Sequence, residues 1–190
     1  MARRKGKLCI VSGPSGSGKS SLIAWLLKEV PAIRFPTSAT TRPRRPGEKN
    51  GVHYHFLTRR AFARGIKEGR FLEYADVYGH LYGTLKATVE AGLERGDILL
   101  KDVDVQGAAA LMQALPRARR LSIFIVPPSL KVLRERLKGR GTESRERFAT
   151  RVREAEKELE ARGLFDHIVV NGDFEKACRR FRAILRPLVG

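Results

Sequence analysis

The sequence predicts an α/β fold in which a parallel β-sheet is flanked by helices, and two observations support this prediction. Short apolar segments alternate along the chain with segments of helical periodicity, an order that produces parallel strands joined by helices. A glycine-rich loop at residues 13–20 separates the first apolar segment from the first helical one. The chain has 190 residues, which is enough to bury a core of its own.

Strands are predicted where apolar residues run together and end at a Gly, a Pro or a polar residue. These segments cover residues 8–12, 98–103, 121–126 and 168–170. Helices are predicted where apolar residues recur every three or four positions. They cover residues 20–29, 59–68, 85–95, 130–137, 148–159 and 174–188, whereas residues 34–58 are rich in Pro, Gly, Thr and Arg and show little helical pattern.

Composition restricts the class of protein. The net charge of +18, from 38 Lys and Arg against 20 Asp and Glu, predicts an anionic partner, which on charge alone is a nucleotide, a nucleic acid or a lipid headgroup. Cys9 and Cys178 form neither a disulfide framework nor a zinc-ligand pattern, so we expect a reduced, cytoplasmic setting. No apolar run approaches the roughly 18 residues of a membrane span, so no membrane association is expected.

The glycine-rich loop at residues 13–20 matches the pattern G-x-x-x-x-G-K-[ST], which binds phosphate where it joins a strand to a helix. Its glycines let the backbone wrap around phosphate oxygens with successive N–H groups pointing inward. Lys19 can reach the β- and γ-phosphates, and the Ser20 hydroxyl can bind Mg²⁺. The loop therefore predicts a nucleoside triphosphate as ligand, with water or a second substrate as the phosphoryl acceptor.

A second cationic segment lies at residues 38–54, where three arginines fall within four positions and two prolines stiffen the chain. Guanidinium groups suit a phosphate, and the hydroxyls of Ser38 and Tyr54 could complete its binding shell. The alternative is a solvated basic loop, because charge runs usually face water.

This segment reads S-x-T-T-R-x-x-R-x-G-E-x-x-G-x-x-Y and resembles the GMP-phosphate motif of guanylate kinases. Further segments resemble that family in the same order and at similar spacing. They lie at residues 71–75, 81–84, 102–107, 139–143 and 169–171, so that the resemblance covers roughly residues 7–180.

The resemblance implies a P-loop kinase core, a GMP-binding α+β insertion and a helical lid within one domain of about residues 6–188. The core is expected at residues 1–36, 89–128 and 160–190, the insertion at 37–88 and the lid at 129–159. The implied reaction is transfer of the γ-phosphoryl group of ATP to GMP, giving ADP and GDP for guanine nucleotide metabolism, with Mg²⁺ as cofactor.

The resemblance also implies roles for individual residues. The ATP site is expected to contain the phosphate loop and residues close to it: Gly13, Pro14, Ser15, Gly16, Ser17, Gly18, Lys19, Ser20, Ser21, Arg136, Arg140 and Asn171. The GMP site is expected to contain Ser38, Arg42, Arg45, Tyr54, Glu73, Tyr82, Thr84 and Asp104. The expected catalytic residues are Lys19, Arg42, Arg140 and Arg151, and the expected Mg²⁺ ligands are Ser20 and, directly or through water, Asp102.

Two carboxylates have an independent chemical reason to select guanine. Guanine presents N1–H and N2–H₂ donors on one edge, adenine presents an acceptor at N1, and a carboxylate only accepts. Without this role, Glu73 would be an exposed strand residue and Asp104 a cap at a strand end. Lys101 departs from the family, whose strand is usually more apolar here, and this leaves open whether Asp102 or Asp104 lies nearer the metal.

Three rival functions are considered. A guanylate-kinase-like interaction module would have no use for a complete phosphate loop, and a nucleic-acid-binding role lacks a basic motif interleaved with aromatic residues. A kinase acting on a phosphorylated sugar would not need Glu73 together with Asp104. We therefore expect ATP and GMP as partners, no specific nucleic acid, and an oligomeric state that the sequence leaves open. The remaining charged residues of the lid helix, Glu158 among them, are expected to form a solvated face.

Overall fold

The computed structural model describes residues 6–77, 79–138 and 145–189, and it confirms the α/β fold. Its core is a five-stranded sheet in the order β2-β7-β1-β8-β9, in which each neighbouring pair is parallel. The strands are β1 (Lys7–Ser12), β2 (Ile33–Arg34), β7 (Ile98–Asp102), β8 (Arg120–Val126) and β9 (His167–Val170).

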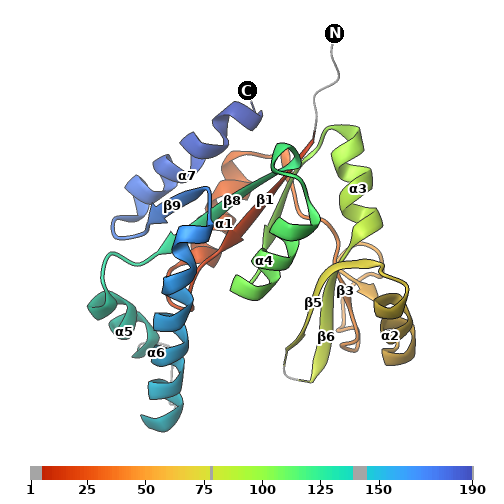
Figure 1. Cartoon of the computed structure of the whole chain (residues 1–190), viewed down its shortest axis with the longest axis horizontal. Helices are drawn as coiled ribbons and strands as arrows, with labels where there is room; N and C mark the ends of the chain where they lie inside the picture. The colour runs from red at the N-terminus through yellow and green to blue at the C-terminus, as the bar shows by residue number, and fades with distance from the viewer. Residues whose placement is uncertain (1–5, 78, 139–144, 190) are drawn as a thin grey trace.

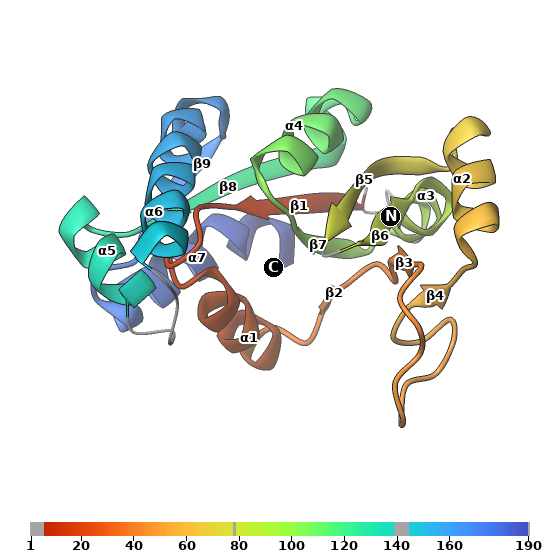
Figure 2. The same cartoon turned by 90° about the horizontal axis from the view of Figure 1, so that it is seen from below.

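Helices cover both faces of this sheet (Figures 1 and 2). One face packs against α1 (Lys19–Glu29) and α7 (Phe174–Val189), and the other against α3 (Lys86–Arg95) and α4 (Val105–Ala114). Because both faces are covered, the central strand β1 is a continuous apolar run, and its residues 8–12 are all buried.

Side chains alternate between the two faces along β7. Leu100 belongs to the apolar cluster beside α1 and α7, whereas Leu99 belongs to the cluster beside α3 and α4. This alternation continues to the carboxyl end of the strand, where open parallel sheets bind their ligands.

A smaller sheet lies at one side of the core, in the order β4-β3-β6-β5 (Figure 2). It consists of β3 (Ala39–Thr40), β4 (His55–Phe56), β5 (Phe71–Val77) and β6 (His80–Leu85), and it is covered by α2 (Arg59–Lys67). Phe62 of α2 stacks on Phe71 of β5 with ring centroids 4.3 Å apart.

On the other side of the core, α5 (Leu130–Lys138) and α6 (Arg145–Glu160) pack together around Leu133, Leu137, Val152 and Ala155. Two short 3₁₀ helices, η1 (Arg117–Arg119) and η2 (Ala161–Leu164), join neighbouring elements. No helix within the described ranges is both long and apolar enough to cross a membrane.

All predicted strands and helices are present, and the elements missed were the short strands β2, β3 and β4, the hairpin β5–β6, helix α4 and the two 3₁₀ helices. The hairpin β5–β6 shows no clean apolar alternation, because aromatic residues lie on both of its faces and Gly83 interrupts it. Helix α4 buries only Ala108 and Leu111, so the helical periodicity of its apolar residues is weak.

Phe181 tests the packing of α7 against the sheet. It is fully buried, whereas Phe174 on the same helix is 44% exposed. We predict that Phe181→Ala lowers the free energy of unfolding by about 3–5 kcal/mol through the cavity it leaves. The control Phe174→Ala should cost less than about 1 kcal/mol. Urea unfolding followed by circular dichroism measures both, and equal losses would contradict this packing.

Candidate active site

The phosphate loop joins β1 to α1, and its shape requires glycine at several positions, of which Gly13 and Gly18 are the most constrained. Gly13 and Gly18 have φ of 145° and 82°, which disfavour other residues. A side chain would also collide with the carbonyl oxygen of Ile125 at Gly13 and with the amide of Asn171 at Gly18. The loop therefore has the tight backbone that a phosphate-binding nest needs.

Lys19 lies at the first position of α1 and points toward the carboxyl end of β7. Its Nζ lies 3.3 Å from Asp102 Oδ1 and 3.4 Å from the carbonyl oxygen of Gly13. Burial raises the pKa of Asp102 above its ordinary value, and the positive charge of Lys19 opposes that rise. Asp102 is thus the acid that contacts Lys19 of the phosphate loop.

Two of the residues expected to lie near ATP support the loop from the side. Asn171 Nδ2 donates to the carbonyl oxygen of Ser17 at 2.8 Å, and Arg136 Nη2 donates to the carbonyl oxygen of Asn171 at 2.9 Å. In the same region, Arg151 Nη2 donates to Ser15 Oγ at 3.4 Å. Arg140 lies outside the described residues.

The expectation for Glu158 was wrong. This residue of α6 is half-buried, and its carboxylate accepts a hydrogen bond from the backbone N–H of Ser15 in the phosphate loop. Burial raises the pKa of Glu158, and the nearby Lys19 lowers it. The helical period alone could not reveal this contact, because it depends on how α6 lies against the loop.

A separate cavity of about 340 Å³ lies between the small sheet and the end of β7. It brings together residues expected to hold an acceptor phosphate and residues expected to read a base. Its polar lining consists of Ser38, Tyr54, Glu73, Tyr82, Lys101, Asp102 and Asp104.

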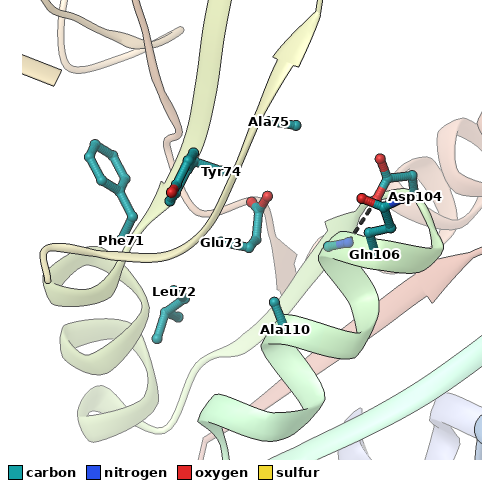
Figure 3. Close-up of a pocket in the computed structure, with 9 residues that line it drawn as sticks. Phe71, Leu72, Glu73, Tyr74, Ala75, Asp104, Gln106 and Ala110 are labelled. Carbon is teal, nitrogen blue, oxygen red and sulfur yellow. Dashed lines mark hydrogen bonds between the residues drawn. The ribbon is translucent and has the colours of Figure 1, made fainter. Parts of the chain in front are cut away.

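Glu73 and Asp104 reach this region from different parts of the chain, as Figure 3 shows for the adjoining pocket that they also line. Thr84 lies opposite Glu73 across the β5–β6 pair, is buried, and donates to Glu73 Oε1. Asp104 caps α4 by accepting from the backbone N–H of Gly107 at 2.7 Å. Asp104 therefore both caps α4 and lines the pocket.

In the arginine-rich segment, Arg42 and Arg45 differ in their contacts and in their exposure. Arg42 Nη2 lies 2.6 Å from Glu48 Oε1, and its guanidinium carbon lies 5.7 Å from the centre of the Tyr54 ring. Glu48 also accepts from the backbone N–H of Arg45 at 2.7 Å, so it fixes the turn. Neither Arg42 nor Arg45 is part of the cavity lining, and Arg45 is exposed.

Lys101 is a residue whose role the sequence left unassigned. Its Nζ donates to Ser38 Oγ at 2.5 Å, and it lines the cavity. Burial lowers its pKa, while Glu73 and Asp102 favour its charged form. A single lysine in an apolar strand can be noticed in the sequence. Its partner cannot, because Ser38 lies 63 positions away along the chain.

A phosphate loop with a lysine–aspartate pair, beside a second polar cavity at the carboxyl end of a parallel sheet, defines a P-loop nucleotide-binding protein with a site for a second ligand. Within that class, the chain belongs to the guanylate kinase family, because the family model described as guanylate kinase matches residues 5–188.

Individual relatives agree with this assignment. A guanylate kinase of Neisseria gonorrhoeae is 49% identical over 93% of this chain and 85% of its own length. One of Alcanivorax borkumensis is 45% identical over 95% of this chain and 86% of its own length. The crystal structure of guanylate kinase from Anaplasma phagocytophilum superposes with a TM-score of 0.69 at 31% identity, over 97% of this chain and 87% of that one.

The pair Arg42–Glu48 predicts a pH-dependent contribution to stability. The hydrogen bond from Arg42 lowers the pKa of Glu48 from 4.5 to about 2. Because this pKa is depressed on folding, the stabilisation is present above about pH 4.5 and is lost as the pH falls toward about 2. Glu48→Gln should therefore be less stable than the wild type at pH 6 and lose that difference near pH 2, as urea unfolding at several pH values would show. A stability difference that does not vary with pH would contradict this role.

Proposed function

We propose that this protein transfers the γ-phosphoryl group of ATP to GMP, giving ADP and GDP. The observation that supports this best is that the acceptor cavity contains Asp102, which also contacts Lys19 of the phosphate loop. The two sites therefore adjoin at one strand end, which is what direct transfer between two bound nucleotides requires.

The described elements support a division of the chain by role. The core sheet and its helices, at residues 1–36, 89–128 and 160–190, would hold the phosphate loop. Residues 37–88 would form the GMP-binding part, since they contain the small sheet, and residues 129–159 would form the lid, since they contain α5 and α6.

The donor site would consist of residues 13–21 with Arg136, Arg140 and Asn171. Backbone N–H groups and the N-terminus of α1 would bind the phosphates, and Lys19 would neutralise the β- and γ-phosphates. Arg140 and Arg151 of the lid would stabilise the charge that spreads over the transferring group. Arg42 would do the same from the acceptor side.

The residues at the loop fit Mg²⁺. Ser20 and Asp102 supply the hard oxygen donors that this ion prefers, and the partly exposed Asp102 side chain leaves room for water. Within the described residues no cluster of three acidic, His or Cys side chains forms a protein cage for a metal. That donor set suits an ion held partly by nucleotide phosphates, which would neutralise their charge when bound.

The chain needs no nucleophile of its own. A phosphate oxygen of GMP attacks the γ-phosphorus of ATP in line, the bond from that phosphorus to the β–γ bridging oxygen breaks, and ADP leaves with this oxygen. Ser38, Arg42, Arg45, Tyr54 and Tyr82 would hold the acceptor phosphate for this attack. Catalysis would then depend on positioning and on charge neutralisation.

Base selection would depend on Glu73 and Asp104, with Thr84 orienting Glu73. A coupled assay of ADP formation with GMP, dGMP, AMP and UMP tests the whole proposal. Transfer to the guanine nucleotides alone is expected, and preference for AMP or UMP would contradict it.

Lys19→Met tests the donor site. It removes the ammonium that contacts the phosphates, and we predict that kcat falls to less than about a tenth of the wild-type value. The thermal unfolding temperature, measured alongside, shows whether the fold is intact. A folded variant with a higher kcat would contradict the stated role of Lys19.

Glu73→Gln and Asp104→Asn test recognition of the base. Each replaces an acceptor oxygen by a donor, and each should cost about 1.5–3 kcal/mol in binding GMP, seen mainly as a raised KM for GMP. The KM for ATP should hardly change.

Inosine monophosphate, which lacks the N2 amine, is the matched substrate. It should be poorer than GMP on the wild type, and the gap should narrow in the variant that removes the N2 acceptor. Equal kinetics for both nucleotides, with GMP unaffected by either substitution, would show that these carboxylates do not read guanine.

A further inference from the structure

Lys101 places a cation inside the acceptor cavity from the core sheet. Along β7, Leu99 belongs to the apolar cluster on the side of α3 and α4, and Lys101 follows two positions later on the same face. The next residue, Asp102, turns to the opposite face and meets Lys19. Lys101 is therefore directed away from the phosphate loop and toward the small sheet.

The contacts of Lys101 leave its ammonium free to bind an anion. An ammonium has three N–H donors, and one of them is given to Ser38 Oγ at 2.5 Å. Among the residues that the structure describes, no carboxylate forms an ion pair with Lys101. By contrast, Lys19 and Arg42 each have a carboxylate partner.

The surroundings of Lys101 indicate which anion it receives. Its partner Ser38 and the hydroxyls of Tyr54 and Tyr82 line the same cavity as the carboxylate of Glu73. A cavity that holds both donors and carboxylates suits a ligand that carries both a phosphate and N–H donors. Lys101 is one of these donors and is hydrogen-bonded to Ser38, a second one.

We propose that Lys101, together with Ser38, binds the phosphate of the acceptor nucleotide, which adds a cation from the core sheet to those of the arginine-rich segment. This inference rests on the proposed function, because the acceptor it assumes is a nucleoside monophosphate. Buried cations are retained where an anion compensates the cost of desolvation, and a phosphate dianion does so while Lys101 remains hydrogen-bonded to Ser38.

The test compares GMP with guanosine, which has the same base and ribose but no phosphate. Lys101→Met keeps most of the unbranched side chain and removes the charge, whereas Lys101→Arg keeps the charge. Lys86→Met is the matched control, because Lys86 is an exposed lysine at the start of α3 that contacts only Glu90 among described acidic residues. Isothermal titration calorimetry gives Kd for both ligands.

Lys101→Met should weaken GMP binding about tenfold, the usual order for a hydrogen bond to a charged group, and leave guanosine binding within about twofold of the wild type. Lys101→Arg should keep most of the affinity for GMP, and Lys86→Met should change neither Kd. In the kinetic assay, Lys101→Met should raise the KM for GMP by a similar factor and leave the KM for ATP unchanged. If Lys101→Met does not fold, Lys101→Gln is measured in its place.

Equal loss of GMP and guanosine affinity would overturn the proposal, because Lys101 would then act on the base side through Glu73. A ratio of the Kd for GMP to the Kd for guanosine that is the same in Lys101→Met as in the wild type would overturn it as well. Failure of the proposed function gives a different result: the wild type would bind GMP more tightly than guanosine and yet form no ADP from ATP and GMP.

Discussion

The alternation of side chains at the carboxyl end of β7 is the constraint on which both halves of the site depend. Lys101 and Asp102 are neighbours in sequence, yet the pleat sends the first toward Ser38 and the second toward Lys19. One strand end therefore serves two ligands. The parallel sheet makes this arrangement possible, because it brings the ends of β1 and β7 together in register, with Val11 opposite Asp102.

Carboxylates already partner the groups that would bind phosphate. Asp102 faces Lys19, Glu48 holds Arg42, and Glu158 accepts from the backbone N–H of Ser15. These contacts orient cations and N–H groups before a substrate arrives, so less ordering is left for the moment of binding. They also limit the mutual repulsion that a chain of net charge +18 would otherwise concentrate at its site.

The phosphate loop and the buried strands could be predicted from the sequence, because each depends on a short stretch of neighbouring residues. The phosphate loop needs only a strand, glycines and a helix start, which lie within a short segment, and the buried strands follow from continuous apolar runs. The hairpin β5–β6 and helix α4 were missed because their periodicity is weak. The contact of Glu158 with Ser15 was missed for another reason, since it joins residues far apart in the chain and depends on how α6 packs against the phosphate loop.

Charge balance gives a physical reason for a lysine in an otherwise apolar strand. The cavity holds the carboxylates of Glu73, Asp102 and Asp104, and an acceptor phosphate would add further negative charge close to them. Like charges in a partly desolvated space repel one another more strongly than in water. Arg42 offsets little of this in the absence of substrate, because Glu48 holds its guanidinium at 2.6 Å. Lys101 is hydrogen-bonded only to a hydroxyl in the described part of the site, so its remaining N–H donors are available to a phosphate. A site that reads guanine with acids thus gains from a cation in the same cavity.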